Sequence, residues 1–395
     1  MRVLRFDALL VGDGTSLRDG ALICDGDAIV EVGPARELLP RAGGLPVTMH
    51  RGVALPGLVN AHTHLELSGL RGKTAPGQGF VPWLESMQAA RVGELEEERD
   101  AAISAAIDAL VGFGVVAVGE VTNGLSAVPA LGRRLLGTVF HEVFGMDREV
   151  GLRALAETPT IPSTLRYVRA PHALYSTHPD VVRAIAANAS PLSMHLSEHA
   201  PERAFLETGG GPFAAFLDRR GVPRGAFPIP EKSPIAYADA LGLLRPDAAM
   251  VHLSDAREPE LDLFASRGAI AVLCPRSNLF IDTRYPPIHA LLARGIPLAL
   301  GTDSLASNTT LDPLADARAL LDKPSVPAAA LIAAATSGGA RALGLGESLG
   351  RLRARTRPGI LLVEGDLGDT DPARFVLQDL SRPRRVLAAA GKADA

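Results

Sequence analysis

The sequence has little cysteine: Cys24 and Cys274 are the 2 cysteines among its 395 residues. Cysteines this few and this far apart exclude a disulfide framework and are typical of a reducing compartment. Residues 1–7 lack the charged-then-apolar pattern of a secretory signal, and no apolar stretch would span a bilayer without glycine, proline or charged interruptions. We therefore expect a cytoplasmic protein with no membrane partner.

A strong excess of charge of either sign is also missing. The formal net charge is -4, which argues against nucleic acid or an anionic membrane as a partner. Hydrophobic residues make up 47% of the chain and charged residues 21%, a balance that can build a sizeable core. The length favours a large catalytic domain with a smaller module. A homo-oligomer is left open.

The two ends of the chain resemble each other in pattern. Short apolar stretches near the N-terminus are separated by the turn signals Asp13-Gly14, Asp19-Gly20 and Asp25-Gly26. Residues from about 352 onward show similar short strands, such as Gly359-Ile360-Leu361-Leu362-Val363. We expect residues 1–53 and 352–395 to form one small β-sandwich around a separate domain of residues 54–351.

The middle of the chain alternates strand and helix patterns. Apolar positions from Ile103 to Val111 follow helical spacing, and Asp312-Pro313 is typical of a helix start. About eight strands alternating with helices indicate a (β/α)₈ barrel. The strands are expected at 58–62, 115–120, 138–143, 167–171, 192–195, 249–252, 270–274 and 298–301.

Two histidines lie two positions apart in Asn60-Ala61-His62-Thr63-His64, at the end of the first expected barrel strand. Since side chains alternate along a strand, His62 and His64 project toward one face. His195 and Asp303 end later strands, and the carboxyl ends of barrel strands hold the active site. Three imidazoles and one carboxylate suit Zn²⁺, with Fe²⁺ as the alternative, and such an ion activates a bound water. Asp303 can also accept that water's proton.

Two further strand-end residues are candidates for proton transfer. Glu198 follows His195 by three residues and can protonate a ring nitrogen and then the leaving group. His252 can hydrogen-bond the attacking oxygen. The competing interpretations are a charge at a helix N-terminus for Glu198 and a structural histidine for His252. We expect His199 to begin a helix. Four other histidines lack such a motif and are expected to be structural: His50, His141, His178 and His289.

Together these residues resemble the amidohydrolase superfamily, in the branch that holds adenosine, S-adenosylhomocysteine, guanine and cytosine deaminases and the triazine hydrolases. The resemblance covers nearly the whole chain, and it implies the ligand set and proton-transfer residues given above. Its carriers are Pro56-Gly57-Leu58-Val59-Asn60-Ala61-His62-Thr63-His64, His195-Leu196-Ser197-Glu198, Cys274-Pro275-Arg276-Ser277-Asn278 and Gly301-Thr302-Asp303-Ser304-Leu305-Ala306-Ser307-Asn308.

The fourth expected strand bears on the number of metals. Members of the superfamily with two metals usually carry a bridging carboxylated lysine there, whereas this sequence reads Arg169-Ala170-Pro171-His172. The resemblance therefore implies one metal. It also implies that His172 contacts the substrate. The alternative is that His172 caps the next helix.

Residues after the first strand bear on the substrate. Relatives that act on S-adenosylhomocysteine carry Trp-Pro-x-Glu, whose Glu holds the ribose diol. Here the sequence is Phe80-Val81-Pro82-Trp83-Leu84-Glu85-Ser86-Met87, with no such Glu at the expected spacing. The pattern looks more like the aminodeoxyfutalosine deaminases of menaquinone biosynthesis, whose substrate joins adenine, ribose and benzoate. The resemblance implies conversion of 6-amino-6-deoxyfutalosine to futalosine and ammonia.

Four residues besides His172 are predicted to contact this nucleoside-like small molecule. Arg91 would pair with the benzoate carboxylate, unless it is a solvated residue on a helix face. Glu66 would hold a substrate hydroxyl or amine, or would support His62 or His64. Trp83 and Ser304 are predicted to line the same site.

Three competing functions remain at this stage. The first is deamination of another substrate: S-adenosylhomocysteine, methylthioadenosine, adenosine, guanine or a cytosine analogue. The second is another cyclic C–N or triazine-type hydrolysis, although Glu198 favours deamination because that reaction needs an acid. The third is a binding protein without catalysis, which the complete set of expected ligands disfavours.

Overall fold

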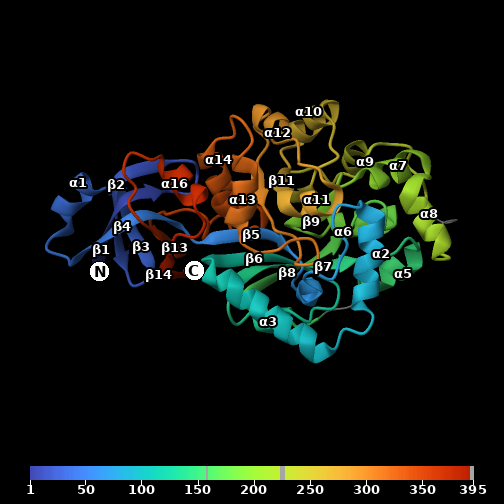
Figure 1. Ribbon diagram of the computed structural model, residues 1–395, viewed down its shortest axis with the longest axis horizontal. Helices are drawn as coiled ribbons and strands as arrows, with labels where there is room; N and C mark the ends of the chain where they lie inside the picture. The colour runs from blue at the N-terminus through green and yellow to red at the C-terminus, as the bar shows by residue number, and fades with distance from the viewer. Residues whose placement is uncertain (157–158, 223–226, 392–395) are drawn as a thin grey trace.

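The computed structural model describes residues 1–156, 159–222 and 227–391 of the chain. Residues 392–395, the last of the predicted C-terminal part, lie outside the described residues. Figure 1 shows a narrow part made from both chain ends beside a broader part made from the middle of the chain. The division at residues 53 and 352 stays a prediction.

Strands from both ends form one sheet in the order β14-β13-β4-β1-β2-β3 within the described ranges. Strand β13 pairs antiparallel with β4, so that Leu361 lies opposite Leu55. The sheet curls, because Ile29 and Thr356 bridge between β3 and the segment before β13. The strands are β1 (Arg2–Leu10), β2 (Ser16–Asp25), β3 (Ala28–Pro34), β4 (Val47–Pro56), β13 (Pro358–Glu364) and β14 (Arg384–Ala390).

One predicted turn in this sheet is wrong. Asp13-Gly14 and Asp25-Gly26 do separate β1, β2 and β3, but Asp19 and Gly20 lie inside β2. Asp19 has φ of 48° and its carboxylate accepts a hydrogen bond from Arg5, on the neighbouring strand β1. A Cβ on Gly20 would lie 2.6 Å from Leu9 Cγ. The glycine therefore serves close packing within a strand rather than a turn.

The predicted barrel is confirmed. Parallel strands of the described chain form two four-stranded sheets, in the orders β5-β6-β7-β8 and β9-β10-β11-β12. Two seams join them: His195 N–H donates to His172 O at 3.0 Å, and Thr302 N–H donates to His62 O at 3.0 Å. The strands are β5 (Leu58–Thr63), β6 (Val115–Thr122), β7 (Leu136–Val143), β8 (Leu165–Pro171), β9 (Leu192–Leu196), β10 (Ala248–His252), β11 (Ile270–Leu273) and β12 (Leu298–Leu300).

Most of the helices surround the barrel, whereas α1 and α16 lie beside the sheet formed by the chain ends, as Figure 1 shows. The expected apolar face between Ile103 and Val111 belongs to α3, and Asp312 caps α13 by accepting a hydrogen bond from Leu314 N–H. The α-helices are α1 (Ala35–Leu38), α2 (Phe80–Arg91), α3 (Glu96–Gly112), α4 (Val128–Leu131), α5 (Arg148–Ala154), α6 (Pro179–Ala186), α7 (Ala200–Thr208), α8 (Gly211–Arg219), α9 (Pro234–Ala240), α10 (Glu258–Arg267), α11 (Pro275–Asp282), α12 (Ile288–Ala293), α13 (Pro313–Leu321), α14 (Ala328–Ala333), α15 (Gly339–Ala342) and α16 (Pro372–Gln378). The described residues also form two short 3₁₀-helices, η1 (Leu39–Ala42) and η2 (Leu65–Leu70), and one π-helical turn, η3 (Ala334–Gly338).

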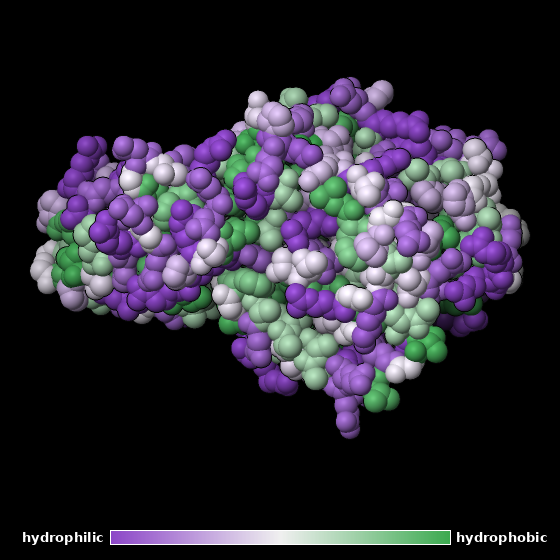
Figure 2. Space-filling view, viewed as in Figure 1, coloured by the Kyte–Doolittle hydropathy of each residue, from purple (hydrophilic) through white to green (hydrophobic). Residues whose placement is uncertain are grey.

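The surface in Figure 2 carries hydrophilic side chains over most of both parts, with hydrophobic ones in small groups between them. None of the helices in the described ranges combines the length and the apolar character that a membrane span requires. The main core lies inside the barrel and between the barrel and its helices, and smaller apolar clusters lie in the sheet formed by the chain ends.

Candidate active site

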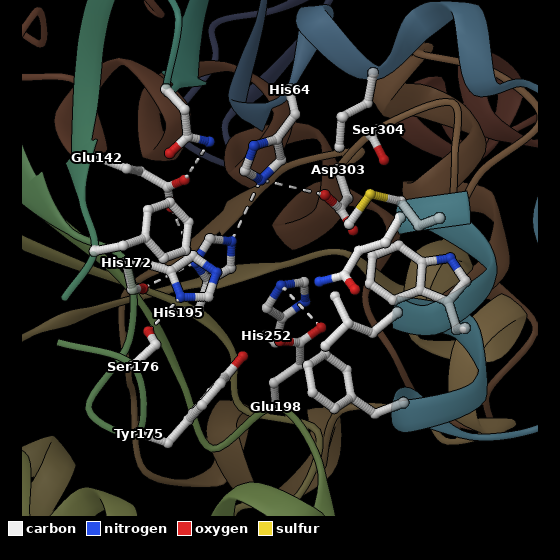
Figure 3. Close-up of a pocket in the computed structure, with 18 of the residues that line it drawn as sticks. His64, Glu142, His172, Tyr175, Ser176, His195, Glu198, His252, Asp303 and Ser304 are labelled. Carbon is white, nitrogen blue, oxygen red and sulfur yellow. Dashed lines mark hydrogen bonds and ion pairs between the residues drawn. The ribbon is translucent and has the colours of Figure 1, made fainter. Parts of the chain in front are cut away.

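The three predicted histidine ligands lie together at the carboxyl ends of β5 and β9. Ring nitrogens of His62, His64 and His195 all lie within 4.8 Å of one another, a spacing that could hold a metal ion. The rings of His62 and His64 meet edge to face, with centroids 4.8 Å apart, and the Nε2 atoms of His64 and His195 are 3.3 Å apart. Figure 3 shows His64 and His195 turned toward each other.

The hydrogen bonding of these histidines fits a metal. His195 Nδ1–H donates to His172 O at 2.9 Å, which leaves the lone pair on Nε2 for an ion. Both ring nitrogens of His62 are buried without a hydrogen-bond partner within the described residues, which is costly unless another ligand occupies one of them. Burial lowers the pKa of all three rings, so they are neutral, as ligands must be.

Asp303 supplies the carboxylate of the cluster. Its Oδ1 lies 3.5 Å from His64 Nε2 and its Oδ2 accepts hydrogen bonds from Ser277 and Ser307, at 2.6 and 2.8 Å. Burial would raise the pKa of Asp303, but His64 and His252 and the two serine hydroxyls bring it below its usual value. Asp303 has φ of 58°, in the left-handed region, and such strain is common where a side chain must be aimed.

Glu198 and His252 lie beside this cluster. Glu198 Oε1 is 3.6 Å from His252 Nε2, and the Asn278 amide donates to His252 Nδ1 at 3.2 Å. Burial raises the pKa of Glu198 well above 4.5, and the charge of Asp303 raises it further. This shift favours the protonated form of the carboxyl group, the form in which Glu198 can act as an acid.

A cavity of about 350 Å³ opens from these residues toward α2 and α8. Trp83 lines the cavity. Its indole N–H donates a hydrogen bond to Ala306 O at 3.1 Å, which fixes the position of the ring. Ser304 lines the cavity beside Asp303, as Figure 3 shows. The wall away from the histidines is largely apolar, with Leu67, Phe80, Leu84, Met87, Phe213 and Phe216.

Arg91 lies at the last turn of α2, where it is exposed and lines the rim of the cavity. Two pairs bind α2 to the region of α8: Arg219 to Glu85 and Arg220 to Gln88, each at 2.9 Å. These pairs fix the position of α2, and with it Arg91, at the mouth of the cavity.

His172 lines the cavity and does not cap a helix. Its Nδ1 is 2.6 Å from Ser176 Oγ, and its ring stacks on Phe144 with centroids 4.3 Å apart. The following helix α6 is capped by His178, which accepts a hydrogen bond from Asp180 N–H. The capping alternative for His172 is therefore wrong, and its contact with substrate stays a prediction.

The carboxylate of Glu66 points at the loop after β6. It accepts hydrogen bonds from Thr122 Oγ1 and from the backbone N–H groups of Asn123, Gly124 and Ser126, the last three at 3.1, 2.9 and 3.2 Å. Glu66 also lines the cavity. Its described bonds thus hold this loop, and its predicted contact with substrate stays a prediction.

Sequence reasoning missed Glu142, which lines the cavity from the end of β7. Its Oε2 accepts a hydrogen bond from Asn123 Nδ2 at 3.2 Å, and burial raises the pKa of the side chain to about 8. Glu142, His172 and His195 also lie close enough to hold an ion. His195 Nδ1 already donates to a backbone carbonyl, however, so the first cluster fits a metal better. A carboxylate ending a barrel strand is the signal that would have found Glu142.

A closed barrel with a histidine cluster and a buried acid at its carboxyl end is an arrangement that suits hydrolysis assisted by a metal ion. Residues 53–388 match the model of the Amidohydrolase family. The chain belongs to the amidohydrolase family and is a hydrolase of carbon–nitrogen bonds.

The following three proteins are among those to which this chain is similar. An aminodeoxyfutalosine deaminase of Deinococcus radiodurans is 28% identical over 366 residues, covering 87% of this chain and 86% of the relative. A 5-methylthioadenosine/S-adenosylhomocysteine deaminase of Nitratidesulfovibrio vulgaris is 30% identical over 402 residues, covering 93% and 81%. The crystal structure of Helicobacter pylori aminofutalosine deaminase with methylthio-coformycin has a TM-score of 0.83 at 25% identity and covers 98% of each chain.

Proposed function

We propose that the protein is a metal-dependent deaminase of an adenine-bearing nucleoside. The observation that carries this proposal is the position of Glu198, a buried carboxyl group with a raised pKa next to His252 and the histidine cluster. Removal of an amino group from a purine ring needs an acid that protonates the adjacent ring nitrogen. Relatives at 28% and 30% identity that are named as deaminases support the same reaction.

The donor set supports one divalent ion at His62, His64, His195 and Asp303. Neutral imidazoles and a carboxylate suit Zn²⁺, with Fe²⁺ as the alternative. When bound, such an ion supplies Lewis-acid activation of water.

Two side chains transfer protons, and a third stabilises the attacking oxygen. Asp303 accepts the proton of the attacking water, and His252 donates a hydrogen bond to the oxygen as it adds to the amino-bearing carbon. Glu198 gives its proton to the adjacent ring nitrogen. Glu198 then takes the hydroxyl proton of the adduct and passes it to the amino group, which leaves as ammonia while the oxygen becomes a carbonyl group. The proton held by Asp303 returns to Glu198 for the next turnover.

Within this class we propose 6-amino-6-deoxyfutalosine as the substrate. Arg91 is the one arginine or lysine among the described residues that line the cavity, and a guanidinium group binds a carboxylate through two parallel hydrogen bonds. The benzoate carboxylate would meet Arg91 at the rim while adenine reaches Glu198. The Helicobacter pylori structure supports this assignment.

A second candidate substrate is 5-methylthioadenosine or S-adenosylhomocysteine. The apolar wall formed by Phe80, Met87 and Phe213 would accept a thioether as readily as a benzoate ring. The relative at 30% identity supports this alternative.

Ammonia release by the zinc-loaded enzyme from a substrate panel separates these candidates. The panel comprises aminodeoxyfutalosine, S-adenosylhomocysteine, methylthioadenosine, adenosine, guanine and cytosine. We expect the highest kcat/KM for aminodeoxyfutalosine. A higher value for methylthioadenosine would keep the reaction and replace the substrate, whereas no release from any member would overturn the proposed function. The expected cytoplasmic location, the homo-oligomer left open and the expected absence of nucleic-acid partners stay untested.

A further inference from the structure

The main chain at Glu198 is held firmly in place. The backbone N–H groups of Ser197 and Glu198 donate to the buried carboxylate of Glu202 at 3.1 and 2.7 Å, and the Ser254 hydroxyl donates to Glu198 O. The side chain of Glu198 is held less firmly, because it lies between two imidazoles at longer range. His252 Nε2 is 3.6 Å from Oε1, and His199 Nε2 is 3.8 Å from Oε2.

His199 carries its proton on the nitrogen that faces Glu198. As expected from the sequence, His199 begins a helix: its Nδ1 accepts a hydrogen bond from Glu202 N–H at 3.0 Å, as the N-cap of α7. A neutral ring that accepts at Nδ1 has its proton on Nε2. That Nε2 is buried and has no hydrogen-bond partner among the described residues. An unused buried donor is costly, so one aimed at a carboxyl group calls for a function.

The orientation of the His199 ring is fixed by the wall of the cavity. Phe80 of α2 stacks on it with ring centroids 3.6 Å apart and planes inclined by 23°, and Tyr175 lies 5.4 Å from it. Phe80 and Tyr175 both line the cavity, whereas His199 lies behind them. Phe80 therefore separates the cavity from the His199 ring and packs against both.

We propose that His199 is a positioning residue for Glu198, whose Nε2–H donates to Glu198 Oε2 when substrate fills the cavity. This inference rests on the proposed function of Glu198 as the acid. At 3.8 Å the two atoms are just beyond hydrogen-bond range, and catalytic hydrogen bonds commonly tighten when substrate binds. The bond would hold Oε1 toward the ring nitrogen of the substrate.

The bond strengthens during the reaction. Glu198 passes its proton to the ring nitrogen, and the resulting carboxylate accepts a stronger, charge-assisted bond from His199, which keeps its own proton. Because the interaction is greatest after this transfer, its loss lowers kcat more than it raises KM.

Two substitutions of His199 separate positioning from capping. His199→Asn keeps an N-cap acceptor but removes the ring and its donor, whereas His199→Phe keeps the ring but removes both the cap and the donor. His178 provides the matched control, since it caps α6 through Nδ1 in the same way and does not line the cavity. Each metal-loaded variant is assayed for kcat, KM and Tm with the panel member that the wild type deaminates fastest.

We expect kcat to fall about tenfold or more in both His199 variants with KM changed by less than about threefold, and kcat to be unchanged in His178→Asn. His199→Asn should keep a Tm close to that of His178→Asn. Wild-type kcat in His199→Asn, or a raised KM with unchanged kcat, would overturn the positioning role while the proposed function stands. If the wild type deaminates no panel member, the proposed function fails and the positioning role fails with it.

Discussion

Glu198 is a buried carboxyl group surrounded by other acids, and this environment has a consequence for pH. Burial raises its pKa well above 4.5, and Asp303 and Glu202 add to the effect. As an acid it must be protonated, so kcat should fall only when the pH rises through this raised pKa. Protonation of His195, one of the proposed ligands, requires a more acidic pH than usual, because burial lowers its pKa below 6.5.

The pH dependence of kcat therefore has a predicted direction. We expect kcat of the metal-loaded enzyme to be constant across neutral pH and to decline on the alkaline side. Stopped assays of ammonia at constant ionic strength measure this profile. A kcat that rises with pH through neutrality, as a carboxylate base would give, contradicts the role of Glu198.

Arg91 gives a prediction about substrate choice. Replacement by Met keeps an unbranched apolar stem but removes the charge, so kcat/KM for aminodeoxyfutalosine should fall about 10- to 100-fold. Methylthioadenosine has no carboxylate, so its kcat/KM should change by less than about threefold. An equal loss for both substrates would indicate that Arg91 supports α2 rather than the benzoate group.

At the scale of residues, sequence spacing predicted some positions and missed others. Side chains alternate along a strand, which predicted that His62 and His64 project toward the same face. His195 and Asp303 were predicted from their positions at strand ends. Glu142 ends a barrel strand, but the residues that give it a place in the site, Asn123, His172 and His195, are distant from it in sequence. The hydrogen bonds of Glu66 depend on a loop 56 to 60 residues away.

At the scale of elements, the cavity wall was the hardest part to predict. Helix α8 contributes Phe213 and Phe216, and its position over α2 depends on contacts more than 130 residues apart, such as Arg219 with Glu85. Helix starts were easier to predict, because a cap is local. The Asp312-Pro313 pair predicted the first turn of α13 correctly.

The cap of α13 also joins the two parts of the molecule. Asp312 accepts from Leu314 N–H and pairs with Arg384 of β14 at 2.8 Å, with both side chains less than a tenth exposed. Asp312→Ala leaves Arg384 unpaired and buried, and should lower Tm by about 5 °C or more. Asp312→Asn keeps the cap acceptor and should lower Tm by less than Asp312→Ala does. Thermal unfolding of the two variants measures the difference, and equal Tm values for wild type and Asp312→Ala would refute this account.

At the scale of the whole molecule, the eight barrel strands were predicted because each buried strand has a continuous apolar pattern between turn signals. Barrel closure could not be read from any one segment, since its seams pair His195 with His172 and Thr302 with His62. The closed ring is what brings His195 and Asp303 beside His62 and His64.

Metal binding should therefore stabilise the whole barrel. Removal of the ion by a chelator should abolish ammonia release and lower Tm, and added Zn²⁺ should restore both, because a ligand that binds only the folded state stabilises it. His195→Ala should show no change of Tm on chelation. The same Tm with and without Zn²⁺ in the wild type would contradict an ion at this cluster.

The most direct test of the central claim compares wild type and Glu198→Gln at equal metal content. Ammonia and the deaminated nucleoside are measured with aminodeoxyfutalosine as substrate. We predict equal amounts of both products from the wild type, and a kcat lower by a factor of about 10² to 10⁴ in Glu198→Gln, the range for loss of a general acid. Near wild-type turnover by Glu198→Gln, or no ammonia from the metal-loaded wild type, would contradict the account.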